Sequence, residues 1–253
     1  MFRLDGQAAI VTGASEGLGR MIAGGLAEAG CGMVLTARTA DRLAEATREV
    51  AAAGGRAVAV PGDVTDPAHT AALVDACREA YGRVDGLVLN AGTAAMSPAE
   101  AEDMAEFTRV MDVNLTAVMR LASAGAAAMI DAGTGGWMIT MSSILGRRAG
   151  TGGGVAAYSA SKAAVEQLTR ELARQWAPHG IRVNCIAPGF FPTALNAPMV
   201  ASPERLAAML ARAPMGRAGE PADITGVAVF LASSASRFVT GHVLACDGGM
   251  EVW

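Results

Sequence analysis

The sequence has few aromatic residues, few cysteines and no run of basic side chains. Aromatic residues make up 4% of the 253 residues, and the net charge is −4 at neutral pH. Such a chain is not expected to bind nucleic acid or an anionic membrane as its main partner. The cysteines lie far apart, with no C-x-x-C pair and no histidine at zinc spacing, so no metal site is predicted. We expect four buried, reduced thiols: Cys31, Cys77, Cys185 and Cys246.

Long apolar segments are scarce as well. The N-terminus reaches Gly6 and polar residues before any apolar stretch long enough for a signal peptide. By inspection, no apolar run approaches the length needed to cross a bilayer. We therefore expect a cytoplasmic protein with no membrane partner.

What is abundant is small and apolar: 52% of the chain is hydrophobic, and 31 residues are glycine. Short apolar runs alternate with longer segments of helical periodicity, which predicts βαβ crossovers and a parallel sheet with helices on both faces. The expected strands are 8–11, 32–36, 57–60, 86–89, 136–141, 182–186 and 242–245. The expected helices include 19–29, 41–53, 67–81, 104–129 and 156–177. No linker or internal repeat is visible, so residues 1–253 are predicted to form a single domain.

One proline-rich stretch, 190–217, interrupts this alternation. Long irregular insertions are usually either lids over a site or disordered loops. The apolar side chains of this stretch, Phe190, Phe191 and Met209 among them, favour a lid that packs on the domain.

A glycine-rich turn joins the first expected strand to the first expected helix. Glycines let the backbone approach a pyrophosphate closely, and a helix N-terminus offers free N–H groups and a positive dipole. Such a turn is weak evidence alone, but glycines spaced G-x-x-x-G-x-G at a strand-to-helix junction favour a dinucleotide site. The predicted cofactor contacts in this turn are Gly13, Ser15, Glu16, Gly17, Leu18 and Gly19.

The second expected strand ends without an acid. An NAD-preferring site usually has a carboxylate here that accepts hydrogen bonds from the ribose 2′-hydroxyl. This chain has Arg38 instead, which could pair with a 2′-phosphate or could simply be solvated. Glu16 lies near the expected phosphate and would repel it. We predict NADP(H) over NAD(H), with NAD(H) as the alternative.

Two further strand ends carry candidate cofactor contacts. In an open α/β sheet, ligands bind at the carboxyl ends of the strands. Asp63, followed by Val64, could accept a hydrogen bond from an adenine amino group or could only cap a turn. Asn90, Ala91 and Gly92 follow the fourth strand, and they too could simply shape a turn.

Tyr158 and Lys162 lie at positions i and i+4 of an expected helix and therefore share a face. A tyrosine with a pKa of about 10 is a poor base, and a nearby cation is expected to lower that pKa. Ser142 and Ser143 end the fifth strand, where a hydroxyl could hold a substrate oxygen. Asn114 lies within a helical pattern, where it could interrupt the hydrogen-bond ladder, hold a water or be a tolerated polar residue.

Taken together and in this order, these motifs resemble the short-chain dehydrogenase/reductase superfamily from about residue 4 to residue 249. The motif Pro188-Gly189-Phe190-Phe191-Pro192-Thr193 belongs to the same resemblance. Three features depart from the family pattern. Leu89 replaces an asparagine, Glu16 stands where many NADP-dependent members have a basic residue, and the loop between Ser143 and Tyr158 is slightly long.

The resemblance implies a doubly wound, seven-stranded Rossmann sheet and a homotetramer. It implies Tyr158 as general acid/base, Lys162 as its activator and as a ribose ligand, Ser143 as the group that orients the carbonyl, and Asn114 as the holder of a water in the proton relay. Thr193 and the backbone near Pro188, Gly189 and Phe191 would meet the nicotinamide and phosphates. Ser143 is preferred to Ser142 because it begins the family's Ser-x-x-Gly stretch.

The predicted reaction is reversible hydride transfer between a nicotinamide and a ketone or secondary alcohol. The gluconate 5-dehydrogenase and 3-oxoacyl-carrier-protein reductase branches are both similar, so a keto-sugar acid and a 3-oxoacyl thioester stay open as substrates. Arg147 and Arg148 could bind a carboxylate or a phosphopantetheine, or could be solvated arginines. A nucleotide-binding sensor without catalysis is the alternative from another class.

Overall fold

The computed structural model describes residues 1–150 and 154–252, and a seven-stranded parallel sheet organises them. The strand order is β3-β2-β1-β4-β5-β6-β7, the doubly wound arrangement predicted from the sequence. The strands lie close to the predicted positions: β1 Ala8–Thr12, β2 Gly32–Thr36, β3 Arg56–Ala59, β4 Gly86–Leu89, β5 Gly136–Met141, β6 Ile181–Pro188 and β7 Val243–Cys246.

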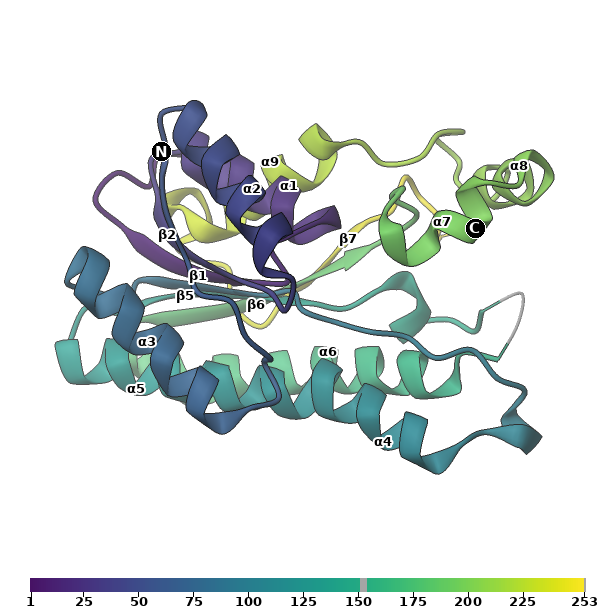
Figure 1. The fold of residues 1–253 in the computed structure, drawn as a ribbon, viewed down its shortest axis with the longest axis horizontal. Coiled ribbons are helices and arrows are strands. Elements are labelled where there is room, and N and C mark those ends of the chain that lie inside the picture. Colours follow the sequence, from purple (N-terminus) through teal and green to yellow (C-terminus); the bar gives the residue numbers. More distant parts are fainter. Residues whose placement is uncertain (151–153, 253) are drawn as a thin grey trace.

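Helices cover both faces of the sheet (Figure 1). One face carries α1 (Gly17–Glu28), α2 (Ala40–Ala52) and α9 (Pro221–Ala232); the other carries α3 (Pro67–Tyr81), α5 (Ala117–Ala132) and α6 (Ala156–Trp176). Successive strand residues point to opposite faces, so Val11 and Ile10 belong to two different buried clusters. Short helical turns complete the chain: η1 Ala99–Ala101, η3 Ile144–Gly146, η4 Ala177–His179 and η6 Ser234–Ser236.

The strand order reverses direction between β1 and β4. At such a switch point the loops after the two strands diverge and leave a crevice beyond the carboxyl ends of the strands. The segments that follow β5 and β6 lie on this side of the molecule, at the right of Figure 1. The fold therefore brings every predicted site motif to one edge of the sheet.

One helix is longer and more apolar than the sequence suggested. Helix α4 (Met104–Met111), a π-helical turn η2 (Asp112–Thr116) and α5 run on continuously from Met104 to Ala132. By length and hydropathy this helix is able to span a membrane, so the expectation that no apolar run approaches that length was wrong. Half of its most apolar window is buried in the protein, with Leu121 and Met129 in the core. Packing on the sheet explains its apolar character, and it is weak evidence for a membrane span.

The segment 190–217 contains η5 (Ala194–Asn196) and two short helices, α7 (Ala197–Val200) and α8 (Pro203–Leu210). Phe191 is buried, whereas Phe190 and Met209 are half-buried and α8 has no buried residue. Leu195 is another apolar residue of this segment, and its side chain lies outside the described residues. This segment thus packs on the rest of the domain mainly through its two ends.

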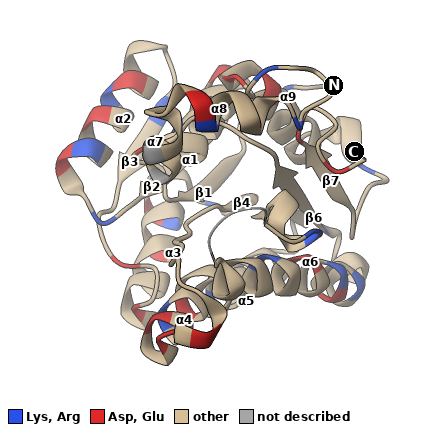
Figure 2. Ribbon diagram, turned by 90° about the vertical axis from the view of Figure 1, so that its right-hand side faces the viewer, with Lys and Arg blue, Asp and Glu red and all other residues tan. Residues whose placement is uncertain are grey.

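Charged side chains of both signs are interspersed on α2, α4 and α6 (Figure 2). Several are paired within a helix, such as Arg109 with Glu106 and Arg174 with Glu171.

All four cysteines are free: three are buried and Cys246 is half-buried, so the prediction of buried thiols holds fully for three of them. Burial raises the pKa of Cys31 and Cys77 to about 12, so these thiols stay protonated.

Candidate active site

The glycine-rich turn between β1 and α1 forms one end of the site. Gly13 and Gly17 have φ values of +65° and +57°, which favour glycine. A Cβ atom on Gly13 would lie 2.8 Å from the Asn90 side-chain nitrogen, so the turn and the loop after β4 are tightly packed. No side chain caps the first turn of α1 at Glu16. A narrow backbone cradle at a helix N-terminus fits a dinucleotide pyrophosphate.

The Asn90 side chain holds this turn in place through hydrogen bonds. Its side-chain nitrogen donates to the carbonyl oxygens of Thr12 (2.9 Å) and Gly13 (3.2 Å). The Thr12 hydroxyl in turn accepts hydrogen bonds from the backbone N–H groups of Asn90 and Ala91, each at 3.0 Å. The sequence left two roles open for Asn90, a cofactor contact and the shaping of a turn. These hydrogen bonds show that it shapes the turn. Thr12 was not singled out from the sequence, and its position at the switch point was the only available signal.

The residues after β3 form a turn of their own. The Asp63 carboxylate accepts from the backbone N–H and hydroxyl of Thr65, at 2.9 and 2.8 Å. These hydrogen bonds lower the pKa of Asp63, and the charge of Arg38 lowers it further. Val64 lines a small pocket of about 10 Å³ with Thr12 and Ala91. Asp63 therefore has the turn-forming role that was one of its two alternatives.

The first turn of α2 and the glycine turn meet through an ion pair. Arg42, in the first turn of α2, donates to the Glu16 carboxylate at 2.5 Å. This pairing partly neutralises the Glu16 charge, which was expected to repel a 2′-phosphate. Arg38 is exposed, and Thr36 at the end of β2 hydrogen-bonds with the His69 ring at 2.8 Å.

Tyr158 and Lys162 both lie in the first two turns of α6, beside Ser143 at the end of β5. The Ser143 hydroxyl accepts from the Leu145 backbone N–H at 3.2 Å and is close enough to Tyr158 to lower the pKa of the phenol. The Ser142 hydroxyl instead donates to the Lys162 carbonyl oxygen and to Glu166, each at 3.0 Å. The Lys162 Nζ lies 5.6 Å from the centre of the Tyr158 ring and donates to the Met141 carbonyl oxygen at 2.8 Å. Lys162 is the only lysine in the chain.

Burial dominates the electrostatics of this group. It raises the pKa of Tyr158, while the neighbouring Ser143 hydroxyl lowers it by less. It also lowers the pKa of Lys162 to about 8. The expected lowering of the Tyr158 pKa was wrong, because desolvation of the phenol dominates and raises it. Tyr158 is thus a protonated phenol at neutral pH.

Asn114 lies in the π-helical turn η2, so an interrupted α-helical ladder is the one of its three alternatives that the structure shows. Its side chain accepts from the Thr93 N–H (2.8 Å) and donates to the Thr93 carbonyl oxygen and the Ser161 hydroxyl, each at 2.9 Å. A Cβ atom on Gly92 would lie 3.4 Å from both the Asn114 side-chain oxygen and the Lys162 Nζ. The structure therefore brings Gly92, Asn114 and Lys162 together.

The segment after β6 reaches back to the glycine turn. Thr193 and Asn196 form a capping box, and a Cβ atom on Gly17 would lie 3.3 Å from the Thr193 methyl group. Gly189 donates to the Cys246 carbonyl oxygen at 2.9 Å, which holds the end of β6 beside β7 after Pro188. The start of the lid segment thus lies over the nucleotide end of the crevice.

Comparison with known proteins agrees with this geometry. A family model described as enoyl-(acyl carrier protein) reductase matches residues 13–251. Galactitol 2-dehydrogenase (L-tagatose-forming) of Cereibacter sphaeroides is 41% identical, over 100% of this chain and 98% of that protein. A short-chain type dehydrogenase/reductase from Mycobacterium marinum superposes with a TM-score of 0.94 at 38% identity, over 98% of this chain and 97% of that one.

The chain is a short-chain dehydrogenase/reductase. A structure described as an NAD(P)-dependent gluconate 5-dehydrogenase from Beutenbergia cavernae, with bound NADP at low occupancy, is also similar (44% identity, TM-score 0.93, covering 100% of this chain and 99% of that one). The chain is accordingly an oxidoreductase, which leaves no support for a sensor without catalysis.

The two arginines after Ser143 in this dehydrogenase/reductase have partners within the chain. Arg147 is paired with Glu166 and Glu251, and Arg148 donates to the Met250 carbonyl oxygen. Both arginines are thus engaged within the chain, although Arg147 remains exposed and Arg148 is half-buried. Sequence reasoning missed these partners because Glu251 is far from Arg147 in the chain.

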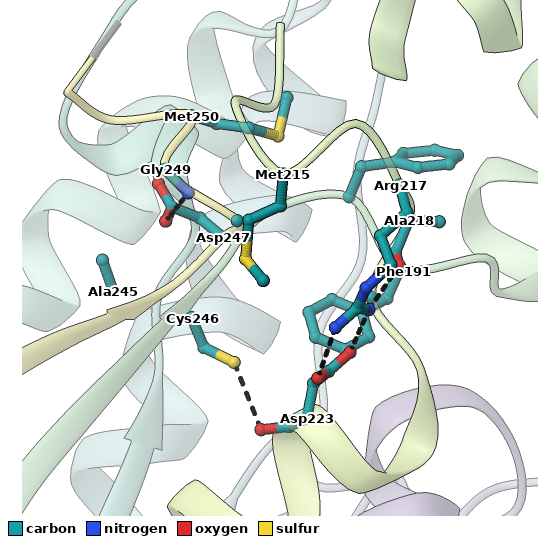
Figure 3. Close-up of a pocket in the computed structure, with 13 residues that line it drawn as sticks. Phe191, Met215, Arg217, Ala218, Asp223, Ala245, Cys246, Asp247, Gly249 and Met250 are labelled. Atoms are coloured by element: carbon teal, nitrogen blue, oxygen red, sulfur yellow. Dashed lines mark hydrogen bonds and ion pairs between the residues drawn. The ribbon is translucent and has the colours of Figure 1, made fainter. Parts of the chain in front are cut away.

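A cavity of about 270 Å³ lies to one side of the site, between the lid segment, α9 and the C-terminus (Figure 3). Phe191, Met215 and Met250 line it, and the Arg217–Asp223 ion pair lies at its edge. None of Asn114, Ser143, Tyr158 and Lys162 is among its lining residues. The candidate active site is therefore the place where these four polar side chains meet, and this cavity lies outside it.

Proposed function

We propose that this enzyme transfers a hydride reversibly between NADP(H) and a ketone or secondary alcohol. The observation that carries the proposal is the meeting of Tyr158, Ser143 and the buried Lys162, next to a turn suited to a pyrophosphate. Two hydroxyl groups close together can hold one carbonyl oxygen while negative charge develops on it. Relatives that act on CH–OH groups support this reading.

In the proposed mechanism, bound NADPH supplies the hydride. Tyr158, kept protonated by burial, donates its proton to the forming alkoxide, and Ser143 orients the same oxygen. The Lys162 ammonium stabilises the phenolate that remains, and in the oxidation direction that phenolate accepts the proton. We assign Asn114 the task of holding a water in the relay that restores the proton, because its side chain fixes the π-helical turn beside Lys162.

The proposed cofactor contacts follow the crevice from end to end. The glycine turn would hold the pyrophosphate, the residues after β2, β3 and β4 the adenosine, and the segment after β6 the nicotinamide. These contacts are Gly13, Ser15, Glu16, Gly17, Leu18, Gly19, Arg38, Asp63, Val64, Asn90, Ala91, Gly92, Tyr158, Lys162, Pro188, Gly189, Phe191 and Thr193.

NADP(H) is proposed as the preferred cofactor because Arg38 is exposed at the end of β2 and Arg42 compensates the charge of Glu16. Replacing Arg38 by aspartate is expected to lower kcat/KM for NADPH by about 10- to 100-fold, as loss of a hydrogen bond to a charged group costs about 1.5–3 kcal/mol. The value for NADH should change little or rise. Steady-state assays with both cofactors measure this, and a wild type that prefers NADH would contradict the proposed preference.

The substrate is proposed only as a class, a ketone or its secondary alcohol, with keto-sugar acids and 3-oxoacyl thioesters as leading members. A screen that follows NADPH absorbance in both directions tests it with acyl, sugar-acid and cyclic ketones. An enoyl thioester belongs in the panel because the matching family model carries that description. Turnover of a ketone is expected; turnover of the enoyl thioester alone would contradict the proposal.

We also propose that residues 1–253 form one domain with its own substrate lid and assemble as a cytoplasmic homotetramer. The apolar helix α9, the edge strand β7 and the fully exposed Phe238 support an interface with further copies. The free cysteines suit a reducing compartment. Light scattering should give four times the chain mass of 25.6 kDa, and a monomer would exclude the tetramer.

A further inference from the structure

Residues 247–251, close to the end of the described chain, form a compact turn that we call the C-terminal turn. The Asp247 carboxylate accepts from the backbone N–H groups of Gly249 (2.9 Å) and Glu251 (2.6 Å). These bonds fix the direction in which the next side chains point. The turn is therefore a built structure and not a loose chain end.

This turn holds the loop that follows Ser143. The Arg147 guanidinium donates to both oxygens of the Glu251 carboxylate, and Arg148 donates to the Met250 carbonyl oxygen. Side chains of Arg147 and Glu251 are only 26% and 28% exposed. Water therefore screens this charge pair less than it screens a fully exposed pair.

From the same arginine the contacts continue to the helix of Tyr158. Arg147 donates to Glu166 at 3.3 Å, and the Glu166 side chain is 7% exposed. Ser142 links Glu166 to the Lys162 backbone through two hydrogen bonds of 3.0 Å. A polar network thus joins the C-terminal turn to both sides of the proposed catalytic group.

A third contact joins the turn to the lid segment. Met250 is 1% exposed and packs with Ile144 of the Ser143 loop and Ala213 after α8, and Met209 lies against this cluster. The backbone N–H of Met215 donates to the Gly248 carbonyl oxygen at 3.1 Å. One short turn therefore contacts both the Ser143 loop and the lid.

We propose that Glu251 and Met250 are positioning residues. They keep the loop that follows Ser143 and the lid segment correctly placed relative to Tyr158. This inference rests on the proposed function, because it assigns the two residues to that reaction. Hydride and proton transfer require reacting atoms in near-attack geometry, and a displacement of about 1 Å can cost on the order of 100-fold in rate. Neither residue needs to touch the substrate to have this effect.

Two variants test the proposal, Glu251→Gln and Met250→Ala. Each is expected to lower kcat for a ketone by about tenfold while the KM for NADPH stays within about twofold. Hydrogen exchange should become faster in segments 143–150 and 209–216. Glu251→Asp should restore part of the rate. Glu171→Gln is the matched control, because it breaks an exposed ion pair on α6, the helix that carries Tyr158, and should change neither rate nor exchange.

The inference is overturned if both variants keep the wild-type kcat, even if their melting temperatures fall, because that outcome describes a purely stabilising turn. If the wild type reduces no ketone, the proposed function fails instead. In that case hydrogen exchange still reports on the contacts: unchanged exchange in both segments of both variants would overturn the inference independently.

Discussion

Replacing Lys162 by methionine is expected to abolish ketone reduction while making the protein more stable. The lysine is almost fully buried, and burial lowers its pKa from 10.5 to about 8. This change corresponds to about 3 kcal/mol of unfavourable free energy for the charged form at neutral pH. Loss of the hydrogen bond to Met141 offsets about 1–2 kcal/mol of that gain. We expect a net increase of about 1–2 kcal/mol in the free energy of unfolding.

The direction of the Lys162 pKa shift determines how the free energy of unfolding changes with pH. The folded-state pKa is lowered, so the unfolded chain binds more protons between about pH 8 and pH 10.5. The wild type should therefore gain stability across that window, and below it the cost of the buried charge is complete. The buried thiols act in the opposite direction, because their pKa values are raised. The difference between wild type and Lys162→Met isolates the lysine.

Urea denaturation of both proteins at several pH values measures this difference. The stability gain of the variant should be largest below about pH 8 and should shrink as the pH approaches 10.5. Because the chain contains a single lysine, labelling lysine with ¹⁵N gives one side-chain signal whose titration reports the pKa directly. A variant less stable than the wild type at neutral pH would show that Lys162 is well solvated or needed for packing.

Sequence reasoning predicted the architecture well because the fold depends on local patterns. Alternation of apolar runs with helical periodicity located all seven strands. The expected helix 67–81 matches α3, which begins after Asp66, whose carboxylate accepts from the Ala68 N–H at 2.9 Å. The order of the motifs placed them at one edge of the sheet. The polar residue in a long helix also pointed correctly to the interruption at Asn114.

Pairings across long sequence separations could not be predicted in this way. The charge compensation of Glu16 by Arg42 and the contact between Arg147 and Glu251 depend on how helices and loops dock. The direction of the Tyr158 pKa was misjudged for a related reason. Spacing along a helix shows that a cation is near, but it does not show how deeply the phenol is buried, and burial decided the sign.

The second prediction with a large effect concerns Tyr158. Tyr158→Phe removes the proton donor and keeps the ring, so kcat should fall by about 10²–10⁴-fold, the usual contribution of a positioned general acid. The Kd for NADPH should stay nearly unchanged. The melting temperature should change little, because only one hydroxyl is removed.

The chain contains only one other tyrosine, which makes the control well matched. Tyr81 donates to the Met33 carbonyl oxygen at 3.0 Å and lies over Arg56, on a different part of the sheet. Tyr81→Phe should therefore cost some stability, about 1 kcal/mol, and leave turnover intact.

The most direct test of the account is the single-turnover rate of NADPH oxidation by a ketone, measured in the wild type, Tyr158→Phe and Tyr81→Phe at saturating cofactor. The account predicts a rate reduced by at least about 100-fold in Tyr158→Phe alone, with the Kd for NADPH unchanged in all three proteins. A Tyr158→Phe variant that oxidises NADPH at the wild-type rate would contradict it.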